Sequence, residues 1–246
     1  MIFRLLKRMA AYDGRMGYRQ ESDEEVFSSY QHTYVVERFK EYFEGKEVLD
    51  AGCWTGPLER ALDELAVRTS VRGIDDNVDA LEAARKSFSQ YTFEHCNLLC
   101  PSESILREWT GRFDTVLFLD VIEHLPKGTE VAVLNVLRGL LKEGGALIMS
   151  TMADHMLNII DPAWMVGHRH YKVKTIKRFL DESGFEAKEI LEIGNLYWDI
   201  DLLLFYGYKH ILGKRYQRGQ WISRQIGRGY KGSRNPTRIY LLAHKV

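Results

Sequence analysis

The stretch VLDAGCWTG, residues 48–56, decides the fold of this chain. A short, mostly apolar run ends here in a turn that contains two glycines, Gly52 and Gly56. Such a run is typical of a buried strand, and glycine allows the backbone to reverse sharply. Pro57 follows at a position that suits the first residue of a helix. The stretch therefore predicts a strand, a tight turn and a helix.

The same alternation continues outward along the chain. We expect strands at residues 47–51, 71–75, 91–95, 113–119, 145–151, 185–193 and 237–245. We expect helices at residues 57–67, 77–88, 102–109, 128–141 and 172–183. Parallel strands need helical crossovers, so the pattern predicts an α/β fold with a doubly wound, mostly parallel seven-stranded sheet.

The two ends of the chain add to this core. Residues 2–10 have the pattern of a basic amphipathic helix, and residues 21–43 that of a second helix, with Ser22 and Glu25 as a capping box. Between the last two strands lies a long segment that is first apolar and then rich in Gly, Arg and aromatic residues. We expect a single domain, residues 1–246, organised as an N-terminal helical cap (1–45), a core (46–193), an insertion (194–236) and a final strand (237–246).

Composition bounds the class of protein. The chain has 246 residues, 45% of them hydrophobic, which suffices for one substantial core. No apolar run is long enough to span a membrane and no secretion signal is evident, so we expect a cytoplasmic protein. The three cysteines, Cys53, Cys96 and Cys100, form no disulfide or zinc pattern; we expect packing residues in a reducing compartment.

Charge is distributed unevenly although the formal net charge is +0. Residues 202–246 contain ten Lys or Arg and no Asp or Glu. This asymmetry indicates either an anionic partner for the C-terminal part or simply a solvated basic face.

Polar residues follow three successive strands. Ligands of open parallel sheets bind at the carboxyl ends of the strands, where the Asp50–Gly56 turn is expected. Asp75 ends the second strand, where a carboxylate can accept hydrogen bonds from ribose hydroxyls, and Asp76 adjoins it. Asn97 follows the third strand, where its amide oxygen could accept from an exocyclic adenine amine. The three positions predict a nucleotide-type ligand.

Five blocks of the sequence resemble the class I S-adenosylmethionine-dependent methyltransferases, and more narrowly their type 11 group. The blocks are VLDAGCWTG, VRGIDDN, EHCNLL, FDTVLFLDVIEHLP and LLKEGGALIMST. The spacing D-x-G-x-x-x-G also differs from the G-x-G-x-x-G of nicotinamide enzymes. The resemblance implies S-adenosyl-L-methionine as cofactor, S-adenosyl-L-homocysteine as product, and cofactor contacts from Asp50, Gly52, Cys53, Trp54, Gly56, Asp75, Asp76, Asn97, Leu98 and Asp120.

Two positions depart from the pattern of that family. Asn97 stands where aspartate is common, which keeps an acceptor oxygen. Trp54 stands where glycine is common, so we expect that this position does not need a positive φ. The Trp54 indole either covers the cofactor or packs against the helix at 21–43.

Histidines near the carboxyl ends of the fourth and fifth strands are candidates for the catalytic base. They are His124, His168 and His170; the alternative is that each only fixes a turn. Asp154 with His155 is a weaker candidate pair. Glu123 could join Asp120 and His124 at a metal, but adjacent ligand types in one turn do not establish a site, and we assign none. Tyr18, Tyr30, His32 and Tyr34 either fold over the cofactor or belong to the core.

The sequence thus favours a methyltransferase acting on a small-molecule, glycan or lipid-linked acceptor, with oxygen as the expected methylated atom. Its basic and apolar ends suggest peripheral contact with an anionic membrane. One alternative is an RNA or DNA methyltransferase, although no Asn-Pro-Pro-Tyr-like motif follows the fourth strand. Another is a cofactor-binding partner protein without catalysis.

Overall fold

A seven-stranded sheet forms the centre of the molecule. The computed structural model describes residues 31–155, 168–214, 216–231 and 236–246. The strands lie in the order β3-β2-β1-β4-β5-β7-β6, and only β7 runs antiparallel to its neighbours. Their bounds are β1 Glu47–Ala51, β2 Ser70–Asp75, β3 Thr92–His95, β4 Phe113–Leu119, β5 Leu141–Met152, β6 Phe185–Ile193 and β7 Arg238–Lys245. The predicted fold class and all seven strands are confirmed.

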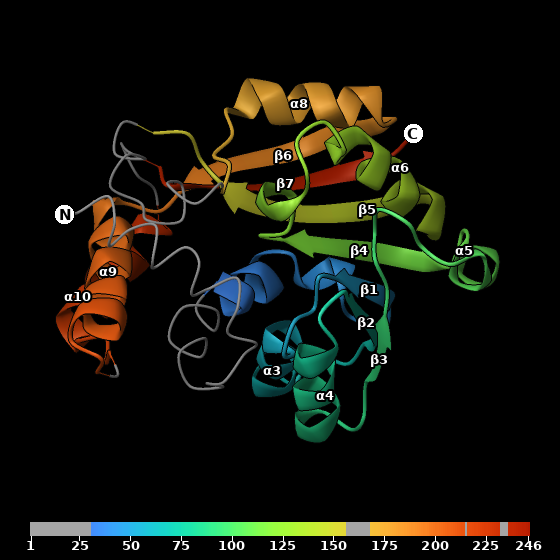
Figure 1. The fold of residues 1–246 in the computed structure, drawn as a ribbon. Helices are drawn as coiled ribbons and strands as arrows, with labels where there is room; N and C mark the ends of the chain where they lie inside the picture. The colour runs from blue at the N-terminus through green and yellow to red at the C-terminus, as the bar shows by residue number, and fades with distance from the viewer. Residues whose placement is uncertain (1–30, 156–167, 215, 232–235) are drawn as a thin grey trace.

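Helices cover both faces of the sheet (Figure 1). They are α3 Pro57–Glu64, α4 Val78–Ser87, α5 Glu103–Trp109, α6 Glu130–Leu140 and α8 Val173–Glu182, joined by the 3-10 turns η1 Lys40–Tyr42 and η2 Ile122–His124. One hydrophobic cluster packs β4 and β5 against α6 and α8, a second packs β1 against α3 and the helix at residues 31–38, and a third, smaller one packs α4 against β3. The strand-helix alternation therefore buries both faces, as a parallel sheet requires.

Element boundaries differ from the predictions by more than two residues in three places. The helix expected at 21–43 ends at residue 38 and gives way to η1, and its part before residue 31 lies outside the described residues, as does the helix expected at 2–10. Helix α3 ends at Glu64 instead of residue 67, before Ala66, which has a positive φ. Strand β5 begins at Leu141 instead of 145, because glycines at 144 and 145 accommodate a register shift against β4.

The segment between β6 and β7 contains more helix than the sequence suggested. It forms α9 Leu196–Tyr206, a π-helical turn η4 Gly207–Ile211, and α10 Gln220–Gly229. Helices α9 and α10 stand beyond the carboxyl ends of β4 and β5, while the C-terminus lies on the opposite side of the molecule (Figure 1). The insertion is thus placed beside the edge where ligands of this fold class bind.

Candidate functional site

The turn after β1 is held open by its backbone. Gly52 has a φ of 91°, and a Cβ atom there would lie 2.3 Å from Cγ2 of Val121. The Gly52 and Cys53 N–H groups both donate to the carbonyl of Ile74, at 2.7 and 3.0 Å. Only glycine fits position 52, because its φ is positive and the Val121 side chain occupies the space that a Cβ atom would take. The Gly52 backbone is partly exposed.

Trp54 corrects one expectation, because it adopts a φ of 49°. The prediction that this position needs no positive φ is wrong. Its N–H donates to Oδ2 of Asp75 at 2.9 Å, and Gly56 N–H donates to the carbonyl of Cys53 at 3.0 Å. A bulky residue in this region stores strain, of the kind that often marks functional sites. The hydrogen bonds around the turn offset that strain.

Asp75 links the first turn to the second strand. Its Oδ2 accepts from Trp54 N–H, and its Oδ1 accepts from Asn77 N–H at 2.8 Å. Burial raises its pKa, against the opposing effect of these backbone donors. The carboxylate is therefore fixed in orientation at the carboxyl end of β2.

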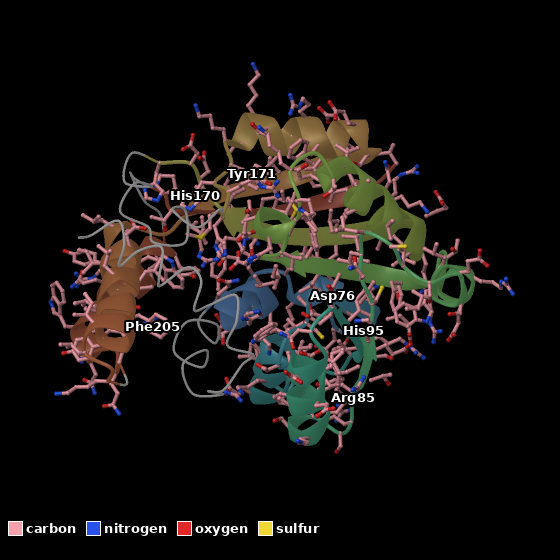
Figure 2. The ribbon with its side chains drawn as sticks, viewed as in Figure 1. Asp76, Arg85, His95, His170, Tyr171 and Phe205 are labelled. Atoms are coloured by element: carbon pink, nitrogen blue, oxygen red, sulfur yellow. The ribbon has the colours of Figure 1, made fainter. Side chains whose placement is uncertain are left out.

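Asp76, His95 and Asn97 gather just beyond β2 and β3. His95 Nε2 lies 3.3 Å from Oδ1 of Asp76, and the two residues lie side by side in Figure 2. Asn97 donates to Oδ2 of Asp76 at 3.4 Å and accepts from Leu99 N–H at 2.9 Å. The adjacent Leu98 is buried. The polar positions expected from the sequence, Asp75, Asp76 and Asn97, thus lie at one edge of the sheet, and His95 joins them there.

Asp120, at the end of β4, is the centre of a polar network. Its backbone φ is 54°, a second strained position next to the first turn. Its carboxylate accepts hydrogen bonds from Gln31 and Ser150, each at 2.8 Å, and pairs with Arg238. Burial alone would raise the pKa of Asp120, but the Arg238 guanidinium and these donors hold it below its usual value. Both oxygens of Asp120 are therefore engaged within the protein.

Buried carboxyl groups lie beneath the first turn. Burial, with the charge of Asp75 as a further cause, raises the pKa of Asp50 to about 7. Glu59 on α3 is fully buried, and neither of its carboxyl oxygens has a hydrogen-bond partner elsewhere in the described part of the chain. Burial and then the Asp50 charge raise the pKa of Glu59 well above its usual value. These two groups resist carrying charge together.

Replacing Glu59 with glutamine is expected to raise stability at pH 8 by about 1 kcal/mol and to change it little at pH 5. A carboxyl whose pKa is higher in the folded state stabilises the fold at low pH, and that contribution is lost as pH rises above its unfolded pKa. Glutamine removes this loss. Thermal unfolding at both pH values measures the difference in stability between Glu59→Gln and the unmodified protein. Glu64→Gln, at an exposed position of the same helix, is the control. A Glu59 variant whose effect is the same at both pH values would contradict the prediction.

The structure brings two of the three candidate histidines together. The rings of His124 and His168 meet edge to face with centroids 4.2 Å apart. His170 instead faces His155, at 6.1 Å between centroids, and His155 lies 3.6 Å from Asp199 of α9. His170 lies near the start of α8, beside Tyr171 (Figure 2). The sequence could not separate these two sets.

His124 has the electrostatics of a neutral base. Its pKa is lowered, first because the surrounding protein removes it from water and then by the charge of Arg169, while Asp120 and Asp75 oppose the shift. Tyr171 and Arg169 both donate to the carbonyl of Ile122 and so fix the η2 turn that carries it. The acids at the ends of β2 and β4 are thus near enough to act on this imidazole.

The remaining candidates have structural partners. Glu123 accepts from the Thr151 hydroxyl at 2.9 Å, and burial followed by the Asp120 charge raises its pKa to about 8. Among the described residues no cluster of metal-ligating side chains is present. Asp154 pairs with Lys172, not with His155. Tyr34 packs in the core against Tyr230 and Tyr240, whereas Tyr18 and Tyr30 lie outside the described residues.

The cysteines are only partly as expected. Cys53 and Cys96 are buried and pack in hydrophobic clusters, as predicted. Cys100 is exposed, so its assignment as a packing residue is wrong. Cys100 lies in the loop between β3 and α5, outside the sheet.

Sequence reasoning missed the partners of Asp120. Arg238 lies 118 residues further along the chain, at the first position of β7, and its guanidinium also lies 4.5 Å above the Trp198 ring of α9. No local spacing links these residues; only the antiparallel return of β7 beside β5 does. The sole available signal was a basic residue at the start of the last strand.

Comparison with known proteins now adds to this geometry. Residues 49–147 match the family model described as a methyltransferase domain. The ubiquinone biosynthesis O-methyltransferase of Pseudomonas aeruginosa strain LESB58 is 26% identical over 160 residues, 60% of this chain and 67% of that protein. No helix among the described residues is long and apolar enough to cross a membrane.

Solved structures share the fold at low sequence identity. Haemonchus contortus phosphoethanolamine N-methyltransferase 2, in complex with S-adenosyl-L-methionine, is 17% identical with a TM-score of 0.63 over 96% of this chain and 60% of its own. The [4+2]-cyclase SpnF is also 17% identical, with a TM-score of 0.61 over 99% of this chain and 93% of its own. One fold thus carries different reactions, and the reaction must be argued from the site.

Proposed function

We propose that the chain is a class I S-adenosylmethionine-dependent methyltransferase, which transfers the donor's methyl group to an oxygen of a small-molecule acceptor. The observation that supports this most is the turn at 50–56, tied by Trp54 N–H to the Asp75 carboxylate. A strained turn with open backbone beside a fixed acid suits a nucleoside with a charged tail.

The residues present fit S-adenosylmethionine. The partly exposed backbone of the turn at Gly52 would border the methionine portion, and Asp75 retains lone pairs for the ribose hydroxyls. Asn97 and Leu98 would border the adenine, and Asp76 and Cys53 would lie beside the ribose and the turn. The buried carboxyl groups of Asp50 and Glu59 favour a cationic ligand, since a nearby positive charge would ease their ionisation. Asp120 supports the turn through its network.

We assign the acceptor side to the edge between η2 and the residues before α8. The bound donor supplies an electrophilic methyl group, which an acceptor oxygen takes by in-line displacement. His124, neutral at physiological pH because its pKa is lowered, receives the proton of the acceptor hydroxyl. His168 orients the His124 ring by edge-to-face contact, whereas His170 lies apart from both, against His155.

We propose an acceptor that is lipid-linked or glycan-linked, used by a cytoplasmic protein at the periphery of a membrane. Oxygen as the methylated atom is supported by the bacterial relative, an O-methyltransferase of ubiquinone biosynthesis. The exposed apolar and basic insertion next to the site favours an acceptor that a membrane presents over a nucleic acid.

Replacing His124 with asparagine is expected to lower kcat by about 10²- to 10⁴-fold, the usual contribution of a general base. Donor affinity should stay within about threefold, because the imidazole serves the acceptor and not the donor. In the unmodified protein, kcat/KM should fall as pH drops through the lowered pKa of His124, since only the neutral ring accepts a proton. His170→Asn is the matched control. A loss in that variant equal to the His124 loss would contradict the assignment.

The experiment that tests the function uses a donor labelled in its methyl group. The protein is incubated with labelled S-adenosylmethionine and fractions of a cellular lipid and metabolite extract, and products are identified by mass spectrometry. We expect the label in an ether-linked methyl group. Label on nitrogen would overturn oxygen as the acceptor, and donor binding without transfer to any fraction would favour a non-catalytic partner.

A further inference from the structure

Exposed apolar side chains concentrate on the insertion. Of the ten large hydrophobic side chains that are exposed among the described residues, seven lie between residues 196 and 221. They are Leu196, Leu203, Leu204, Tyr208, Ile211, Leu212 and Trp221. Ile211 and Trp221 are 64% and 61% exposed. Single exposed leucines are ordinary, but a contiguous group marks an interaction surface.

The group forms one face of a helix whose other face is already packed. Positions 196, 203, 204, 208, 211 and 212 recur at helical spacing through α9 and into η4. On the packed side, Trp198 is buried, and the guanidinium groups of Arg218 and Arg238 lie 5.8 and 4.5 Å from its ring centroid. Helix α9 is therefore packed on one side, while its exposed apolar side chains are left uncovered by the described residues.

Charge on the insertion is of one sign. Its two acids, Asp199 and Asp201, are 3% and 0% exposed. Asp201 accepts from Tyr216 OH at 2.6 Å and pairs with Arg218 at 2.8 Å. The exposed charges of α10 and its flanks are cations, namely Lys214, Arg224, Arg228 and Lys231. The surface is thus apolar and cationic, with no exposed carboxylate between residues 194 and 231.

The insertion is anchored at the edge that holds the proposed site. Arg238 stacks on Trp198 and pairs with Asp120, so α9 is fixed against the end of β4. A partner bound to the outer face of α9 would lie next to the acceptor side, not behind the sheet (Figure 1).

We propose that the face formed by Leu203, Leu204, Tyr208, Ile211, Leu212 and Trp221 docks in the plane of an anionic lipid bilayer. The apolar side chains enter the boundary of headgroups and acyl chains, and the cations of α10 meet anionic headgroups. A second copy of the chain fits less well, because a two-fold contact would oppose like charges. The consequence of this docking is that a lipid-borne acceptor enters the site from the bilayer. That consequence rests on the proposed function, whereas the docking itself does not.

Vesicle flotation of the full chain tests the proposal. The probes are vesicles of phosphatidylcholine alone and of phosphatidylcholine mixed with phosphatidylglycerol, at low and high salt. We expect the protein to float with the anionic vesicles at low salt. Binding to neutral vesicles, or to anionic vesicles at high salt, should be at least about tenfold weaker. Ile211→Asp/Leu212→Asp should weaken it at least about tenfold on anionic vesicles, and Arg224→Glu/Arg228→Glu should do the same.

Val246→Asp is the matched control. Val246 is 69% exposed, a fraction similar to the 64% of Ile211. It is the C-terminal residue, at the other end of the molecule from α9 (Figure 1). Binding of S-adenosylhomocysteine should be unchanged in every variant, which verifies the fold independently of the membrane. No flotation of the unmodified protein, an equal loss in Val246→Asp, or a dimer that the Ile211→Asp/Leu212→Asp change dissociates would each overturn the proposal. Flotation without donor binding would instead contradict the proposed function and leave the docking intact.

Discussion

Replacing Asp75 with alanine is expected to weaken binding of S-adenosylmethionine and S-adenosylhomocysteine at least about a hundredfold, or about 2.7 kcal/mol. The alanine removes the proposed partner of the ribose hydroxyls. It also removes the acceptor of the Trp54 and Asn77 N–H groups, at 2.9 and 2.8 Å, so the strained turn loses its tie to β2. Isothermal titration calorimetry measures the loss directly.

Two further variants separate the ribose contact from the support of the turn. Asp75→Asn keeps one acceptor oxygen and should bind more tightly than the alanine variant but less tightly than the unmodified protein. Asp76→Ala, at the exposed neighbouring position, should weaken binding by less than about tenfold. Unchanged affinity in Asp75→Ala would contradict the placement of the donor.

Replacing Arg238 with leucine is expected to lower the free energy of unfolding by about 3 kcal/mol. The change leaves the Asp120 carboxylate, held charged by Arg238, without its counterion in a partly buried network. It also removes the cation from the face of Trp198 and thereby loosens α9. Chemical denaturation at neutral pH measures the loss in the free energy of unfolding. The loss should be smaller in the double variant Asp120→Asn/Arg238→Leu, which no longer leaves a buried carboxylate unpaired.

The control is an ion pair of similar geometry at the surface. Lys142 and Asp114 lie 2.9 Å apart with their side chains 44% and 29% exposed. Lys142→Met should cost less than about 1 kcal/mol, because water screens the pair. If Lys142→Met and Arg238→Leu lowered the free energy of unfolding equally, or if the double variant recovered no stability, Arg238 would not be the counterion that the network requires.

The sheet was predictable because its causes are local. Apolar runs such as FDTVLFL at 113–119, punctuated by glycine and proline, predict strands and helices without knowledge of distant residues. The polar positions at 75, 76 and 97 followed from the same logic, since parallel strands bring their carboxyl ends to one edge. The structure confirms the shared edge, while the roles of these residues stay predictions.

What failed depended on contacts between distant segments. The positive φ of Trp54 is enforced by Asp75, 21 residues away, and local preference alone argues against it. Asp120 acquires Gln31, Ser150 and Arg238 only when the helix at 31–38 and strands β5 and β7 have assembled. Helix α10 was missed because glycines at 227 and 229 lower helix propensity, and packing of Ile226 in the fold overrides that preference.

A crystal structure of the protein with S-adenosylhomocysteine tests the central claim most directly. We predict the ligand across the carboxyl ends of β1 and β2, with its ribose hydroxyls hydrogen-bonded to Asp75, its adenine beside Asn97 and Leu98, and its amino acid portion at Gly52. The sulfur should face His124. A ligand bound elsewhere, or a Trp54 side chain that fills this space while the ligand is excluded, would contradict the account.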